Sequence, residues 1–217
     1  MTRLLQRRRL AGFTLIEVLV ALFIMSLLAL MGWQGVDSIV RTREASQARL
    51  EQTLRLNTVL AQWEQDLAAL QETPVLPALN FDGATLRLTR RASGGLQVVA
   101  WQLQPGLTPA DGQRWVRWAG PAVTQSGDLK NSWQLSQQLQ TSTQLTPLEL
   151  VNGVTQWQLY FFRGNAWSNA QSSAGTASNG TTTALPSGVR LLLSFSGGSS
   201  HLQGDLVKDV VLGPQLP

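Results

Sequence analysis

The chain has 217 residues, 43% of them hydrophobic, which is enough for a membrane segment and one domain of ordinary size. It contains no cysteine, which excludes disulfides, thiolate zinc sites and cysteine nucleophiles. The net charge of +4 comes entirely from Arg3, Arg7, Arg8 and Arg9, and the chain from residue 13 onward carries 13 charges of each sign. A nucleic-acid partner is therefore not expected, because it requires a clustered surplus of Lys and Arg.

The first predicted element is a membrane-spanning helix over residues 13–35. Residues 13–33 read FTLIEVLVALFIMSLLALMGW, with Glu17 as the one charge, and about 20 apolar residues suffice for a helix to cross a bilayer. The arginines before this stretch place residues 1–12 in the cytoplasm and the rest of the chain outside. A secretory signal peptide is disfavoured because the apolar run is long and no small-residue cleavage site follows it. An uncleaved signal anchor is the other alternative.

The junction before this helix reads Ala11-Gly12-Phe13-Thr14-Leu15-Ile16-Glu17. It resembles the class III signal of type IV pilins and of type II secretion pseudopilins. The resemblance implies that a prepilin peptidase cuts after Gly12, removes residues 1–12 as a cytoplasmic leader and leaves an N-methylated Phe13.

Glu17 is expected to have a partner, because a carboxylate in the centre of a membrane helix costs roughly 2.5–3.5 kcal/mol. The nearest cation is the free amino group of Phe13 on a neighbouring subunit, which exists only after cleavage. Such a pair would fix the axial register between subunits. The alternative is that Glu17 reaches the cytoplasmic interface, one turn from the new N-terminus.

An amphipathic continuation of the helix is predicted for residues 36–72. Its apolar positions recur every three or four residues: Leu56, Val59, Leu60, Trp63, Leu67 and Leu70. Glu64 and Asp66 are assigned to positions off this stripe. Thr73-Pro74 ends the helix near Glu72.

From residue 73 to 217 the pattern predicts a β-rich periplasmic head. Apolar residues alternate at Leu86 and Leu88, at Val99 and Trp101, at Trp157 and Phe161, and at Val189 and Phe195, and a last strand is expected over Leu206 to Leu212. Residues 164–188 are rich in Gly, Ser, Asn and Thr and are predicted to form an exposed mobile loop. The fold class is α+β and pilin-like, with a long N-terminal helix packed on an antiparallel sheet.

The whole chain resembles minor pseudopilin J of the type II secretion system, the GspJ family. Besides the junction, the resemblance rests on the Gln-, Glu- and Leu-rich helix from Arg43 to Leu70 and on four head segments. These are Leu86-x-Leu88-Thr89-Arg90, residues 96–101, the turn at 150–154 that leads into the strand 157–162, and residues 184–189. It implies a structural component of the pseudopilus tip, which supports protein export across the outer membrane. The implied partners are minor pseudopilins I, K and H and the major pseudopilin G, with the inner membrane as the starting location. Gln34 and Gly35 depart from the proline usual in major pilins, and a PilW-like type IV minor pilin is the closest competitor.

Catalytic and metal-binding patterns are missing from the sequence. The single histidine, His201, is expected in a solvated loop, no serine lies in a G-x-S-x-G elbow, and neither HExxH nor an EF-hand loop is present. We therefore expect no enzyme, no cofactor and no metal, although the scattered carboxylates leave calcium undecided. Asp205 and Asp209 are interpreted as surface residues.

Most of the eight tryptophans fall on positions expected to be core. Trp115, Trp118 and Trp167 are the candidates for an exposed aromatic patch that contacts another subunit. Three functions follow from the sequence in order of preference. They are a pseudopilin that assembles with homologous subunits, a type IV minor pilin whose head binds a surface, and a membrane-anchored periplasmic enzyme, for which no catalytic constellation was found.

Overall fold

The computed structural model describes residues 12–106, 112–139, 147–171, 184–197 and 202–213. The chain divides into two compact units, Met1–Ala48 and Arg49–Pro217. Helix α1 (Leu15–Ala68) contributes residues to both units.

The first unit consists of the N-terminal part of α1. Its apolar side chains are exposed, as Phe23 and Met31 illustrate at 65% and 66%. An 18-residue window of this helix has a mean hydropathy of 2.5 and none of it is buried, so the helix is long and apolar enough to cross a membrane. This agrees with the prediction of a single spanning segment.

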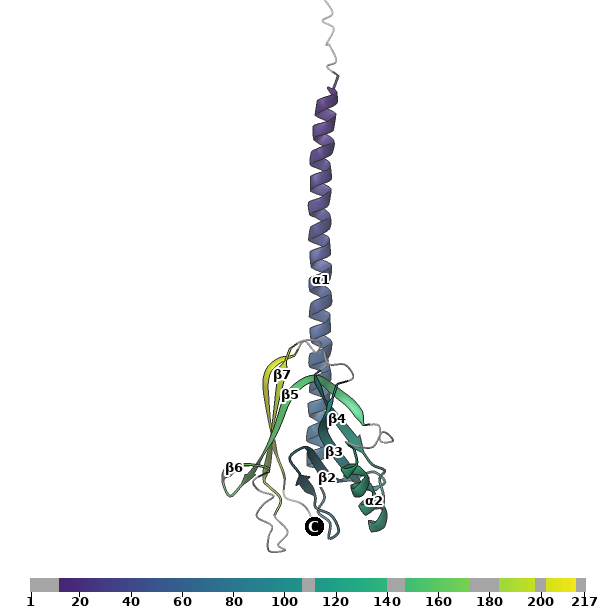
Figure 1. Ribbon diagram of the computed structural model, residues 1–217, viewed down its shortest axis with the longest axis vertical. Helices are drawn as coiled ribbons and strands as arrows, with labels where there is room; N and C mark the ends of the chain where they lie inside the picture. The colour runs from purple at the N-terminus through teal and green to yellow at the C-terminus, as the bar shows by residue number, and fades with distance from the viewer. Residues whose placement is uncertain (1–11, 107–111, 140–146, 172–183, 198–201, 214–217) are drawn as a thin grey trace, which may run out of the picture. The chain divides into compact units, whose positions relative to one another are not determined.

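The second unit is built on one antiparallel sheet (Figure 1), which confirms the predicted α+β class. Its strand order is β1-β2-β3-β4-β5-β7-β8, and β6 pairs with β5 off this path. The strands are β1 (Leu79–Phe81), β2 (Thr85–Ala92), β3 (Gly95–Pro105), β4 (Gln113–Ala119), β5 (Leu148–Arg163), β6 (Ala166–Asn169), β7 (Gly188–Ser196) and β8 (Gln203–Val211).

The main core lies between one face of the sheet and the C-terminal part of α1. Trp63 of α1 is fully buried. The centroid of its ring lies 5.2 Å from that of Trp101 and 5.5 Å from that of Trp115. The alternation predicted for the strands is observed, because Leu86, Leu88, Leu159, Leu191 and Leu193 join the same cluster. Five of the eight tryptophans are buried: Trp63, Trp101, Trp115, Trp118 and Trp157.

The opposite face of the sheet is covered in part by a short helix, α2 (Ser126–Gln137), that the sequence analysis did not predict. Leu129 of α2 packs with Val98, Ala100 and Trp118 in a second, smaller core. The helix escaped prediction because only Leu129, Ser132 and Ser136 are buried in it, and two of these are polar. Pattern reading depends on apolar residues that recur, and α2 has too few of them.

Helix α1 ends at Ala68, earlier than the predicted end near Glu72. Residues 69–71 leave the helix because the outer edge of β2 offers them backbone partners. The N–H of Arg91 donates to the carbonyl of Ala69 at 2.8 Å, and the N–H of Gln71 donates to the carbonyl of Thr89 at 2.9 Å. Sheet pairing thus replaces the last predicted helical turn.

The prediction of a loop over residues 164–188 is wrong at its start. Strand β6 pairs with the end of β5, with Trp167 opposite Phe162, and the turn between them is Gly164-Asn165. Both turn residues have positive φ, 55° and 72°, which is the geometry of a type I′ hairpin turn. Residues 172–183 of the predicted loop lie outside the described residues.

Candidate functional site: the capped N-terminus and the Asp66 centre

The first candidate site is the beginning of α1. The backbone N–H and the hydroxyl of Thr14 both donate to Oε2 of Glu17 at 2.8 Å, and the N–H of Glu17 donates to Oγ1 of Thr14 at 3.3 Å. This reciprocal arrangement is a capping box, which satisfies N–H groups that an α-helix leaves without partners in its first turn. Glu17 therefore has a partner within its own chain, which the sequence analysis did not foresee.

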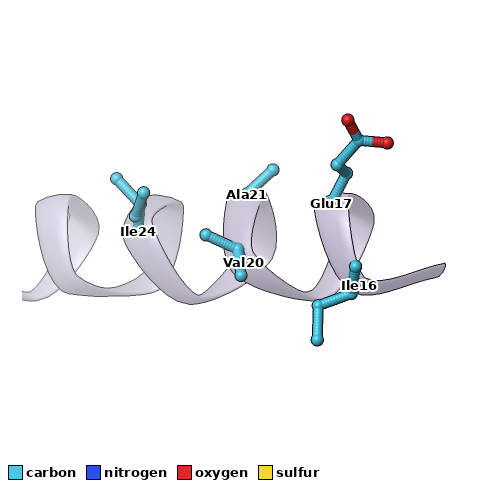
Figure 2. Close-up of a pocket in the computed structure, with 5 residues that line it drawn as sticks. All are labelled: Ile16, Glu17, Val20, Ala21 and Ile24. Atoms are coloured by element: carbon cyan, nitrogen blue, oxygen red, sulfur yellow. The ribbon is translucent and has the colours of Figure 1, made fainter. Parts of the chain in front are cut away.

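The surroundings of Glu17 are apolar (Figure 2). Glu17 lines a shallow hollow together with Ile16, Val20, Ala21 and Ile24, and its carboxylate projects outward from the helix. Only Oε2 is used by Thr14, and among the described residues Oε1 accepts no hydrogen bond. The capped carboxylate consequently retains one oxygen for a further donor, next to an apolar surface.

Gly12 and Phe13 precede the helix and are exposed, Phe13 at 87%. Residues 7–33 match the family model described as the prokaryotic N-terminal methylation motif. The match spans the end of the basic segment, the Gly12-Phe13 junction, the capping box and most of the apolar stretch. The chain therefore has the N-terminus of a type II secretion pseudopilin or a type IV pilin-like protein.

The second candidate site is a carboxylate in the core of the second unit. Asp66 of α1 has no exposed side-chain surface. Its two oxygens accept five hydrogen bonds: from Gln62 Nε2 at 2.9 Å, Arg90 Nη1 at 2.8 Å, Trp101 Nε1 at 2.9 Å, Arg117 Nε at 2.7 Å and Arg117 Nη2 at 3.0 Å. The helix is thereby bonded to three adjacent strands, β2, β3 and β4.

The donors to Asp66 are themselves held in place. Arg90 also donates from Nε and Nη2 to Oε1 of Gln97, at 3.0 and 2.8 Å, and Nε2 of Gln97 donates to the carbonyl of Gly120 at 2.7 Å. The guanidinium of Arg117 lies 5.9 Å from the centroid of the Trp101 ring. Arg90, Arg117 and Trp101 thus each make a second contact besides the bond to Asp66, which is what a buried polar network needs to be tolerated.

The prediction that Asp66 lies off the apolar stripe of α1 is wrong. Asp66 follows Trp63 by three residues and precedes Leu70 by four, so it shares their face of α1. That spacing was the available signal. The partners could not be found in the same way, because Arg90 and Arg117 lie 24 and 51 residues further along the chain.

The predicted aromatic patch of Trp115, Trp118 and Trp167 is wrong for two of its members. Trp115 is completely buried in the main core and Trp118 is 8% exposed beneath α2, so neither ring is available to a partner. Trp167 is half-buried on β6, where the Arg190 guanidinium lies 4.3 Å from its ring centroid. Arg190 also forms a bidentate pair with Asp209, with both N–O distances at 2.7 Å. Asp205 and Asp209 are exposed, as predicted.

Among the described residues, no three His, Asp or Glu side chains are grouped closely enough to hold a metal ion. His201 lies outside the described residues. The expectation that the chain has no cofactor and no catalytic role stays a prediction.

Proposed function

We propose that this chain is a minor pseudopilin of the type II secretion system, of the J type, and acts as a structural subunit of the pseudopilus tip. The observation that carries the proposal is the methylation motif over residues 7–33, joined to an apolar helix whose capped Glu17 keeps one oxygen available. The J type is favoured over other pilin-like proteins by the resemblance of the head segments.

The mechanism is assembly rather than catalysis. Cleavage after Gly12 by a prepilin peptidase would create a cationic amino group on Phe13, which the methylation would keep basic. Oε1 of Glu17 on a neighbouring subunit would accept a hydrogen bond from it, while the exposed apolar side chains around Glu17 would pack between neighbouring helices. Before assembly the bilayer would hold the same surface, with the N-terminus in the cytoplasm and the head in the periplasm.

Two of the residues that hold Asp66 lie in the head segments that resemble the J family. Arg90 ends the first segment, on β2, and Trp101 ends the second, on β3. Their bonds to α1 support a head that is rigidly joined to the last turns of its helix. A rigid joint is what a tip subunit needs if contacts between heads are to be transmitted to the helices. The proposed partners are pseudopilins I, K and H, followed by the major pseudopilin G.

The test is genetic, in a strain that lacks the gene for this chain. We expect export of proteins into the medium to fail, to be restored by the wild-type chain, and to remain defective with the Gly12→Ala variant. Surface pili should be unaffected. Loss of pili with normal export would contradict the proposal and establish the type IV minor pilin, the PilW-like alternative. Normal export and normal pili would reject both functions.

A further inference from the structure

Strand β8 is the last strand of the sheet, and no other described strand pairs with its outer edge. Two backbone bonds fix the phase of its pairing with β7. The N–H of Leu212 donates to the carbonyl of Ser187, and the N–H of Gly197 donates to the carbonyl of Leu202, both at 2.9 Å. Because antiparallel pairs alternate, the even-numbered residues of β8 bond to β7. The N–H and C=O groups of residues 205, 207, 209 and 211 therefore point to the free edge.

The same four residues present their side chains on the solvent side of the sheet. Asp205, Val207, Asp209 and Val211 are exposed, the two valines at 56% and 84%, whereas Leu206 and Val210 pack against the main core. Strand β8 thus combines unpaired backbone groups with exposed β-branched side chains over nine residues. An edge of this kind is a template for the addition of a further strand.

Charge decides which strand can be added. In a pair of antiparallel β8 strands that overlap over their whole length, Asp205 of each copy faces Asp209 of the other. A parallel pair of the two free edges cannot be in register, because residues whose backbone groups point outward would have to lie opposite residues whose groups bond to β7. Like charges directly opposite one another destabilise strand pairs, so the edge disfavours full-length antiparallel pairing with a second copy of this chain. Lys208 is already paired with Glu64 of α1 and needs no opposite charge from a partner.

We propose that the free edge of β8 binds an extended strand of a different subunit of the same assembly, one that places Lys or Arg opposite Asp205. This proposal rests on the proposed function for the choice of subunit. Asp205 is the more important of the two acidic positions, because Asp209 shares its charge with Arg190. The added strand would continue the antiparallel sheet and cover Val207 and Val211.

The experiment places a photoreactive benzoylphenylalanine at Val207 of the full chain, in cells that contain the whole assembly. The matched control carries the same group at Leu135, which is an exposed apolar residue of α2 at 41%. We expect the Val207 probe to give an adduct with another N-methylated subunit, at a yield at least about fivefold above the Leu135 control. Asp205→Lys should lower this yield by about three- to tenfold, and Asp205→Asn by less.

Asp205→Lys should also produce an adduct of the chain with itself, because the introduced ammonium group would then face Asp209 across the antiparallel pair. A wild-type adduct with a second copy or with a protein that is not pilin-like would overturn the proposal, as would a yield no higher than the control. The intact mass of the same sample separates the two proposals. A methylated Phe13 without an adduct rejects the β8 edge alone, whereas an unprocessed N-terminus rejects the proposed function as well.

Discussion

Nε of Arg117 lies 2.7 Å from Oδ2 of Asp66, although 51 residues of chain separate them. The contact joins the end of α1 to β4 through a carboxylate that has no exposed surface. The side chains of Arg90 and Arg117 are themselves only 20% and 12% exposed, so both cations depend on Asp66 for their compensation. This centre, more than any surface ion pair, is expected to determine the stability of the head.

Asp66→Ala should lower the free energy of unfolding by about 3–5 kcal/mol, because it leaves two largely buried arginines without their carboxylate. The measurement is urea unfolding of the full chain in a non-ionic detergent, followed by tryptophan fluorescence. Glu64→Ala is the matched control on the same helix. Glu64 pairs with Lys208 but both side chains are well exposed, so we expect a loss below about 1 kcal/mol. Equal losses for the two variants would contradict the role given to Asp66.

Trp101→Phe and Trp63→Phe form a second matched pair. Both rings are fully buried and both substitutions remove similar volume, but only Trp101 donates its indole N–H to Asp66. Within the described residues, Nε1 of Trp63 has no hydrogen-bond partner. We expect Trp101→Phe to cost about 1–2 kcal/mol more than Trp63→Phe, because a hydrogen bond to a charged group is lost. Similar unfolding midpoints would show that the Trp101 bond contributes little.

The hairpin between β1 and β2 predicts a pH dependence. Partial burial alone would raise the pKa of Asp82, but hydrogen bonds donated by Arg87, Thr85 and Ala84 outweigh it and hold the pKa below its ordinary value. The stabilisation is therefore complete above the ordinary aspartate pKa of about 3.9 and is lost as pH falls below it. Asp82→Asn should reduce the loss of stability between pH 7 and pH 3, measured by urea midpoints. An unchanged pH dependence would contradict this assignment.

The sequence predicted those parts of the fold that depend on local periodicity. Alternation at Leu86 and Leu88, or at Trp157 and Phe161, reports which face of a strand is buried, and this information is contained in a few neighbouring residues. The Asp66 centre and the true end of α1 depend on strands far along the chain, and periodicity carries no information about them. The burial of Trp115 and Trp118 likewise depends on elements distant in sequence. Helix α1 covers Trp115 on one face of the sheet, and α2 covers Trp118 on the other.

At the N-terminal candidate site, neighbouring residues contained all the information that was needed. Gly12, Phe13 and Glu17 were identified from a contiguous motif, whereas the capping role of Glu17 follows from its spacing to Thr14 and was overlooked. The sequence pattern T-x-x-E before an apolar run was sufficient to predict it.

The two roles of Glu17 are separable by mutation. Thr14→Ala removes the capping hydroxyl and should weaken the start of the helix by about 0.5–2 kcal/mol while leaving the carboxylate in place. Glu17→Gln keeps the size of the side chain and a carbonyl oxygen for the cap, but removes the charge. We expect Glu17→Gln to reduce incorporation into assembled filaments at least about tenfold, because one lost charge pair in an apolar surrounding exceeds about 1.4 kcal/mol. Thr14→Ala should reduce this incorporation far less. The measurement is the subunit content of sheared filaments. Equal defects in the two variants would contradict the pairing role and leave Glu17 with its capping role alone.

The most direct measurement is the intact mass of the protein purified from its native membrane, alongside the Gly12→Ala variant. We expect the wild-type mass to correspond to residues 13–217 plus one methyl group, and the variant to retain residues 1–12 without methylation. A wild-type protein that keeps its first twelve residues would contradict assignment to the prepilin pathway.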